Sequence, residues 1–131
     1  MSIQRRWFEE VWNQGKESTI DELLSPDVIV HGLVDPGGNE VTGVQSFKGF
    51  YHAFRRAMTG IHIDVQDTVT EGDLSVVRFV ATGKHTGEGM GKPPKGRDLK
   101  FTGMAMLRIK DGKIAECWNN IDFVSMYQQM E

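Results

Sequence analysis

The sequence predicts an α+β fold in which helices come first and antiparallel strands follow. Within residues 2–14 and 43–59, apolar residues recur at three- and four-residue spacing, as on one face of an amphipathic helix. After Gly60 the pattern changes to an alternation of apolar and polar residues, which is typical of strands. Asp111-Gly112 is a strong signal for a two-residue hairpin turn. Helices and strands segregated in this way predict N-terminal helices packed in a curved, mainly antiparallel sheet.

Four helices are expected. The first covers 2–14, with Ser2 as its N-cap, and a short second helix covers 18–24. The third has the strongest periodicity and covers 43–59. A short terminal helix is expected over 122–130.

The expected strands fill most of the second half of the chain. A short strand at 28–30 leads into His31, and a loop with turn residues follows at 35–39. A long loop with five glycines covers 83–97; it lacks the spacing of a phosphate-binding loop, which argues against nucleotide binding. The remaining strands are expected at 61–65, 74–82, 98–110 and 113–121.

Composition narrows the class of protein. The 131 residues are consistent with one domain covering 1–131, and the net charge of -3 argues against a nucleic-acid binder with a basic surface. No apolar run approaches the roughly 18 residues that span a bilayer, and no signal-peptide pattern is present, so a cytoplasmic location is expected. The single Cys117 and four histidines without ligand spacing support no metal motif, and no cofactor is expected.

Counting back from the hairpin turn assigns side chains to faces. A two-residue turn at 111–112 places Trp118 opposite Ala105 and Asp122 opposite Phe101, so these residues share a face. The small residue Gly103 lies between them, which predicts a cavity beside the aromatic ring and the acid. A β-bulge would shift this register.

The opposite face of the hairpin is also apolar in this register. It carries Met104, Met106, Cys117 and Ile121. Helices can cover one face of the sheet, and a second copy of the chain can cover the other. We therefore expect a homodimer through this outer face.

Asp122 is the first candidate for chemistry. A carboxylic acid among apolar and aromatic groups can act as a general acid or base without a metal. The alternative is an N-cap for the terminal helix, with Ser125 three residues later. His31 is a candidate partner for Asp122 or for a substrate oxygen, and the alternative is a histidine satisfied at a strand end.

Other side chains are candidates for substrate binding, and each has a structural alternative. His85 lies in the glycine-rich segment and can instead bond to backbone. Arg78 interrupts an apolar strand and either points inward to an anion or reaches solvent. Trp12, Phe47 and Tyr51 are core residues that can also form a pocket wall, and Trp118 belongs with them.

Several motifs together give the chain a family resemblance. It resembles the SnoaL-like polyketide cyclases, also called ester cyclases, of the superfamily named after nuclear transport factor two. The resemblance covers nearly the whole chain and is most specific from Arg78 onward. The motifs that carry it are Arg78, Gly83/His85/Gly87, Pro94/Gly96/Arg97, Asp111 to Ile114, and Glu116/Trp118/Asp122.

The resemblance implies a conical α+β barrel and a function. Asp122 corresponds to the family's proposed acid/base aspartate, which works without metal or cofactor in an apolar pocket. The implied reaction is an intramolecular aldol condensation that closes a ring in a small apolar or aromatic carbonyl compound, as in a lyase or isomerase. The alternatives are a non-catalytic small-molecule binder of the same fold, or a related dehydratase, isomerase or hydrolase.

Overall fold

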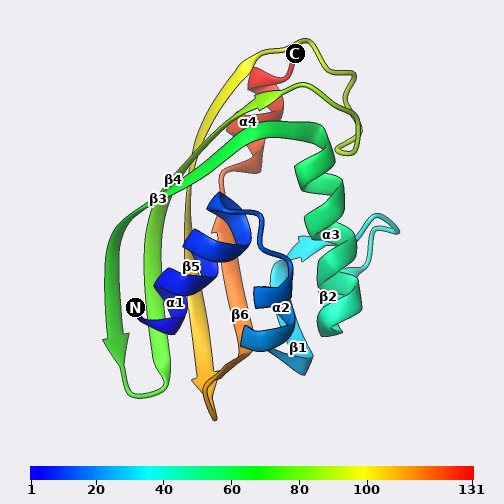
Figure 1. Cartoon of the computed structure of the whole chain (residues 1–131). Helices are drawn as coiled ribbons and strands as arrows, with labels where there is room; N and C mark the ends of the chain where they lie inside the picture. Colours follow the sequence, from blue (N-terminus) through cyan, green and yellow to red (C-terminus); the bar gives the residue numbers. More distant parts are fainter.

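A computed structural model describes residues 1–131. Four helices, one π-helical segment and six strands alternate as the sequence order suggests, with the helices mostly first (Figure 1). The elements are α1 (Ile3–Arg6), η1 (Trp7–Asn13), α2 (Ser18–Leu23), β1 (Leu24–Val34), β2 (Glu40–Thr42), α3 (Gly43–Ala57), β3 (Met58–Glu71), β4 (Leu74–His85), β5 (Asp98–Lys110), β6 (Lys113–Ile121) and α4 (Phe123–Gln129).

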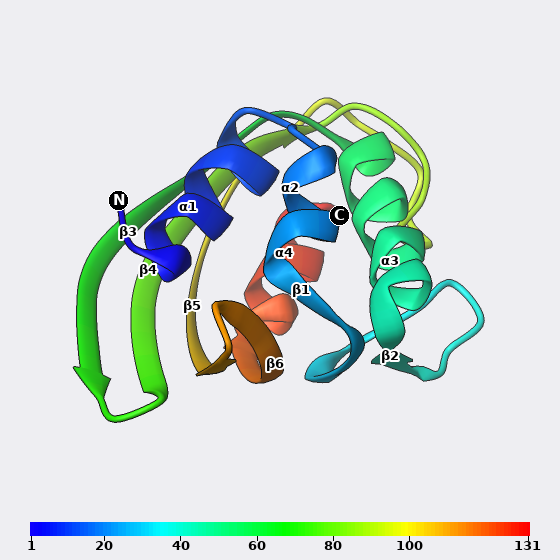
Figure 2. The same cartoon turned by 60° about the horizontal axis from the view of Figure 1, so that its bottom comes forward.

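One curved sheet holds all six strands, in the order β2-β1-β6-β5-β4-β3. The pair β1 and β6 is parallel and every other neighbouring pair is antiparallel. The α+β class and the mainly antiparallel sheet are confirmed, but the sheet stays open between β2 and β3 and does not close into a barrel. Figure 2 shows α1, α2 and α3 within the curve of the sheet. Residues of α2 and α3 are buried there, whereas α1 itself has no buried residue.

The first helical stretch changes its winding after one turn. Ser2 caps α1 as predicted, since its Oγ accepts a hydrogen bond from the Arg5 N–H at 3.3 Å. The chain then continues as the π-helical segment η1. The wider turn places Trp7, Phe8 and Trp12 on one buried side. This segment therefore brings three large aromatic residues against the inside of the sheet.

The helix α3 supplies most of the remaining aromatic core. Phe47, Phe50 and Phe54 are buried along one face, at the spacing that the sequence shows. The helix ends at Ala57, two residues earlier than predicted, because Met58 already pairs with His85 in the sheet.

Three strands are longer than their apolar cores. The strands β1, β3 and β4 extend beyond the predicted 28–30, 61–65 and 74–82. Backbone pairing with a neighbouring strand also keeps polar residues extended, provided that their side chains face solvent. By contrast, β5 and β6 have the predicted bounds.

The β5–β6 hairpin forms at the predicted turn but not in the predicted register. Asp111 and Gly112 both have positive φ, 53° and 75°, as a type I′ turn requires. Ile109 pairs with Ile114, but the ladder then resumes at Arg108 and Glu116, so Ala115 is an extra residue.

A shift of one residue moves every later side chain of β6 to the other face. Trp118 pairs with Met106 instead of Ala105, and Asn119 takes the place opposite Ala105. The expectation that Trp118 and Asp122 share the cavity face is therefore wrong. Cys117 and Ile121, expected on the outer face, point inward and line the cavity described below.

Candidate functional site

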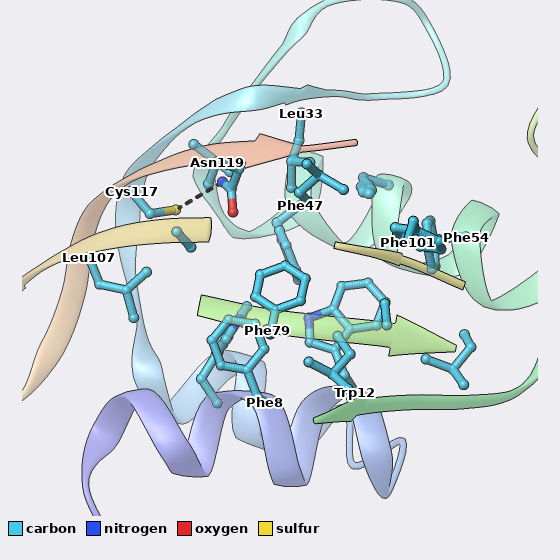
Figure 3. Close-up of a pocket in the computed structure, with 18 of the residues that line it drawn as sticks. Phe8, Trp12, Leu33, Phe47, Phe54, Phe79, Phe101, Leu107, Cys117 and Asn119 are labelled. Carbon is cyan, nitrogen blue, oxygen red and sulfur yellow. Dashed lines mark hydrogen bonds between the residues drawn. The ribbon is translucent and has the colours of Figure 1, made fainter. Parts of the chain in front are cut away.

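An apolar cavity lies between the helices and the inner face of the sheet. Its volume is about 60 Å³, and 21 of the 23 residues that line it are hydrophobic. Figure 3 shows Phe8 and Trp12 on the helical side, with Phe79, Leu107 and Cys117 on the strands. No acidic or basic residue lines this cavity, which we call the inner chamber.

The amide of Asn119 is the main polar group of the inner chamber. Its Nδ2 donates a hydrogen bond to the His31 carbonyl oxygen at 3.1 Å and approaches the Cys117 sulfur at 3.8 Å. Its oxygen is turned toward the aromatic rings of the chamber (Figure 3) and has no hydrogen-bond partner within the chain. The Asn119 oxygen is thus an unpaired hydrogen-bond acceptor in the chamber wall, whereas the hydroxyl of Thr82, the other polar lining residue, donates to the His62 carbonyl oxygen at 3.4 Å.

Asn119 was missed by the sequence analysis, because the predicted register placed it on the outer face. The signal that could have found it is its neighbour Gly32. A Cβ at Gly32 would lie 2.1 Å from the Asn119 carbonyl oxygen, so the backbones of β1 and β6 approach closely there. Gly32 also has a φ of 87°, which favours glycine.

Cys117 contributes a thiol to the same wall. Burial raises its pKa to about 12, so the sulfur stays protonated and is a poor nucleophile near neutral pH. The cysteine therefore acts as a small apolar wall residue beside Asn119.

The predicted aromatic wall is present only in part. Trp12 and Phe47 line the inner chamber, whereas Tyr51 lies behind Trp12 with its ring 5.2 Å away. The Tyr51 hydroxyl donates a hydrogen bond to the Val11 carbonyl oxygen at 2.9 Å. Tyr51 thus fixes η1 against α3 and does not face the chamber.

Gly103 does not leave the open space that its size suggested. A Cβ at this position would lie 2.5 Å from the Phe79 ring, so the ring fills the room above the glycine. Phe79 in turn packs on Phe8, with ring centroids 5.2 Å apart. This aromatic pair sets one limit of the inner chamber.

Asp122 adopts the structural alternative given for it. It is the N-cap of α4, and its Oδ1 accepts a hydrogen bond from the Ser125 N–H at 3.0 Å. The side chain is exposed and does not line the inner chamber, although its neighbours Ile121 and Phe123 do. The acid is thus at the rim of the site.

His31 and Trp118 lie together on the outer face of the sheet. Their rings stack with centroids 5.5 Å apart. His31 Nε2 is 2.7 Å from Glu116 and Nδ1 is 3.4 Å from Glu40, and these hydrogen bonds, that of Glu116 first, raise the pKa of His31. The structure does not bring the imidazole to Asp122; only the His31 carbonyl, through Asn119, supports the chamber.

The two remaining candidates lie outside the chamber. Arg78 is exposed on the outer face, which is the alternative in which it reaches solvent. Its Nε donates a hydrogen bond to Asp67 Oδ2 at 2.8 Å. His85 is fully buried, and neither ring nitrogen has a hydrogen-bond partner. Its backbone N–H donates to the Arg97 carbonyl oxygen at 2.9 Å.

A second, larger pocket adjoins the inner chamber. This vestibule has a volume of about 480 Å³ and lies between the end of β1, α3, α4 and the glycine-rich loop. Leu33, Phe50 and Phe123 line both spaces. Asp35 is the one charged residue among the residues that line either space.

No group of three or more histidine, cysteine, aspartate or glutamate side chains is placed to hold a metal ion. None of the helices combines the length and the apolar character needed to cross a bilayer.

Comparison with known proteins decides the family. The family model for SnoaL-like polyketide cyclases matches residues 2–130. The chain belongs to this family. The resemblance drawn from the motifs is thereby confirmed.

Individual relatives agree with this assignment. The chain is 23% identical over 126 residues to aklanonic acid methyl ester cyclase DnrD of Streptomyces peucetius, covering 95% of this chain and 86% of that protein. The crystal structure of IdmH, a proposed polyketide cyclase of Streptomyces antibioticus, matches with 31% identity and a TM-score of 0.81, covering 97% of this chain and 94% of IdmH. A proposed polyketide cyclase of Jannaschia sp. CCS1 is 22% identical with a TM-score of 0.84, covering 98% of this chain and 88% of that one, and supports the fold alone.

Proposed function

We propose that this chain is a cyclase-type enzyme that closes a ring in a small apolar carbonyl compound by an intramolecular aldol-type step. The observation that carries the proposal is the apolar, uncharged chamber with the Asn119 amide in its wall, in a chain of the SnoaL-like family. Together with the adjoining vestibule, such a chamber excludes water from an enolate and restricts a flexible substrate to a folded conformation.

The proposed reaction balances without an added oxidant or reductant. A base removes the proton from a carbon that lies between two carbonyl groups, and the enolate carbon attacks a ketone carbon in the same molecule. The alkoxide that results takes up a proton. One C–H bond and the π bond of the attacked ketone C=O break, one C–C bond and one O–H bond form, and the product is an isomer of the substrate.

Asp122 is the proposed acid/base. Its support is the match to the family motif and its position between two residues that line the inner chamber. One carboxylate oxygen caps α4, and the other has no partner within the chain. For proton transfer, the carboxylate turns from the cap toward the vestibule side of Phe123, where a bound substrate can reach it. We also propose a cytoplasmic location, since Cys117 is a free thiol.

A non-catalytic binder is the second candidate. It is favoured by the same hydrogen bond, because an aspartate held as an exposed N-cap is already satisfied structurally. A binder needs the apolar chamber and the Asn119 amide but no acid. A dehydratase, isomerase or hydrolase on this fold would share the chamber and differ in the substrate.

The substitution Asp122→Asn separates these two functions. Asparagine is as good an N-cap as aspartate, so the variant keeps the helix end and loses the acid. The assay incubates the protein with aklanonic acid methyl ester, the compound in the relatives' names, and follows the ring-closed product by chromatography. We expect turnover to fall by about 100-fold or more in the variant, as for loss of a general acid or base.

The controls distinguish a lost acid from a lost fold. Asp122→Ala removes the cap as well and is expected to cost about 1 kcal/mol of stability, which Asp122→Asn should not. Unchanged turnover in Asp122→Asn would show that another group moves the proton. Binding of the ester by both proteins without conversion by either would favour the binder.

A further inference from the structure

The inner chamber cannot hold an aromatic ligand by itself. An engineered apolar cavity of about 150 Å³ binds benzene, whereas the inner chamber measures only about 60 Å³. The adjoining vestibule measures about 480 Å³. A compound with one or more rings that enters the inner chamber therefore also extends into the vestibule.

Three residues from different elements line both spaces. Leu33 comes from the end of β1, Phe50 from α3, and Phe123 is the first residue of α4. Leu33 and Phe50 are buried, and Phe50 packs edge-on against Phe54 with centroids 5.6 Å apart. The two spaces are therefore contiguous at these three residues.

The glycine-rich loop, which forms the outer wall of the vestibule, is held against α3 by backbone contacts. The N–H groups of Thr86 and Gly87 donate to the Ala57 carbonyl oxygen at 3.1 and 3.0 Å. Gly89 lies so close to α3 that a Cβ would be 2.5 Å from the Ala53 carbonyl oxygen. The chain then places Met90 and Gly91 on the vestibule. The space is thus bounded by anchored backbone.

The charge of the combined site comes from Asp35. Its Oδ1 accepts a hydrogen bond from the Asn39 N–H at 3.0 Å, which holds the carboxylate in the loop after β1. The second oxygen has no partner within the chain, and the residue is half-buried. No basic side chain lines either space to offset this charge.

Lys92 follows Gly91, a residue of the vestibule wall, and forms an ion pair with Glu131 outside the vestibule lining. Its Nζ is 2.9 Å from Glu131 Oε1, so its charge is already neutralised. An anionic group in the vestibule would face the Asp35 carboxylate without a counter-ion, which is unfavourable in a partly desolvated space. A hydroxyl group could donate to the same oxygen.

We propose that the inner chamber and the vestibule form one elongated site, and that Asp35 makes this site select uncharged, ring-containing compounds over anionic ones. A neutral compound would place its apolar part against the aromatic wall and a hydroxyl group near Asp35. The proposal rests on the proposed function only in treating the inner chamber as part of a ligand site.

Two fluorescent probes with the same skeleton test this selection. N-phenyl-1-naphthylamine is neutral, and 8-anilino-1-naphthalenesulfonate adds a single sulfonate. In fluorescence titrations of the whole chain, we expect the neutral probe to bind with a dissociation constant at least about tenfold lower, since two like charges a few ångströms apart repel strongly at a partly buried site. Asp35→Asn should reduce this ratio to below about threefold, mainly by improving sulfonate binding.

The variants are chosen to fold. Asparagine can keep the turn hydrogen bond that Asp35 accepts. Asp27→Asn is the matched control, because Asp27 is an exposed aspartate of β1 that lines neither space, and the net charge changes equally. Equal binding of both probes by the unaltered protein, or the same ratio in Asp35→Asn as in Asp27→Asn, would overturn the selection by Asp35.

Failure of this proposal is distinct from failure of the proposed function. Turnover of the neutral ester without discrimination between the probes would leave the cyclase function standing and remove the selection. Discrimination between the probes without turnover would do the reverse.

Discussion

Filling the inner chamber should stabilise the protein and impair binding at the same time. Ala105 is buried on β5, lines the chamber and pairs with Asn119. The substitution Ala105→Val adds two methyl groups at this point. It leaves the strand geometry favourable, because β-branched residues suit a pleated strand.

The expected magnitude follows from the volume of the chamber. At about 24 cal/mol per Å³ of unfilled space, a cavity of about 60 Å³ corresponds to roughly 1.4 kcal/mol of lost stability. Burying two more carbon atoms contributes about 1.6 kcal/mol by area transfer, which agrees with that limit. Imperfect fit reduces the gain, and we expect about 1 kcal/mol, or about 4 °C in Tm.

Urea unfolding and the neutral probe give the two readouts. The free energy of unfolding should rise, and the dissociation constant for N-phenyl-1-naphthylamine should increase by about tenfold, the equivalent of 1.4 kcal/mol. Ala57→Val is the control, because Ala57 is buried but lines neither space, and overpacking there should cost about 1 to 3 kcal/mol. If Ala105→Val lost as much stability as the control, the empty space would not be beside Ala105. If it gained stability without weakening the probe, the space would not belong to the ligand site.

Two further predictions concern the outer face of the sheet. The pKa of His31 is raised, mainly by Glu116, so the protonated histidine contributes stability that is present below pH 6.5 and is lost as pH rises through the raised value. Solvent screening keeps the contribution below about 1 kcal/mol, and the gap in unfolding free energy between the unaltered protein and His31→Asn should shrink from pH 6 to pH 9; a constant gap would contradict this. We also propose that a second copy of the chain covers this face. The contact residues would be Met104, Met106 and Trp118, since Cys117 and Ile121, which the predicted register placed there, face inward. Light scattering should then give twice the chain mass of 14.7 kDa for the unaltered protein and the single mass for Met104→Glu, while a monomeric unaltered protein would rule the dimer out.

Most of the fold could be predicted because its signals are local. Helical spacing, the change of period after Gly60 and the turn at Asp111-Gly112 each depend on neighbours in sequence. The bounds of β5 and β6 are reproduced for this reason. The predicted strands are too short where the sequence has no apolar run and only pairing with a neighbouring strand keeps the chain extended. His85, which pairs with Met58, is an example.

The candidate site was harder to predict because it depends on one inserted residue. Ala115 carries no turn or bulge signature in the sequence, yet it decides which of Trp118 and Asn119 faces the chamber. The motif that identifies the family could be recognised in either register. The positions of its side chains could not, since each one-residue shift exchanges the two faces.

The bulge has a consequence for chemistry as well as for geometry. It gathers His31, Glu116 and Trp118 on the outer face, where ionisable groups can pair in contact with water. It leaves Cys117 and Asn119 inside, a neutral thiol and a neutral amide. The inner chamber therefore carries no charge of its own, and any charge that a ligand meets is at the rim, on Asp35 in the vestibule or on Asp122 at the start of α4. Selection and proton transfer are both assigned to that rim, while the chamber supplies shape, exclusion of water and one hydrogen-bond acceptor.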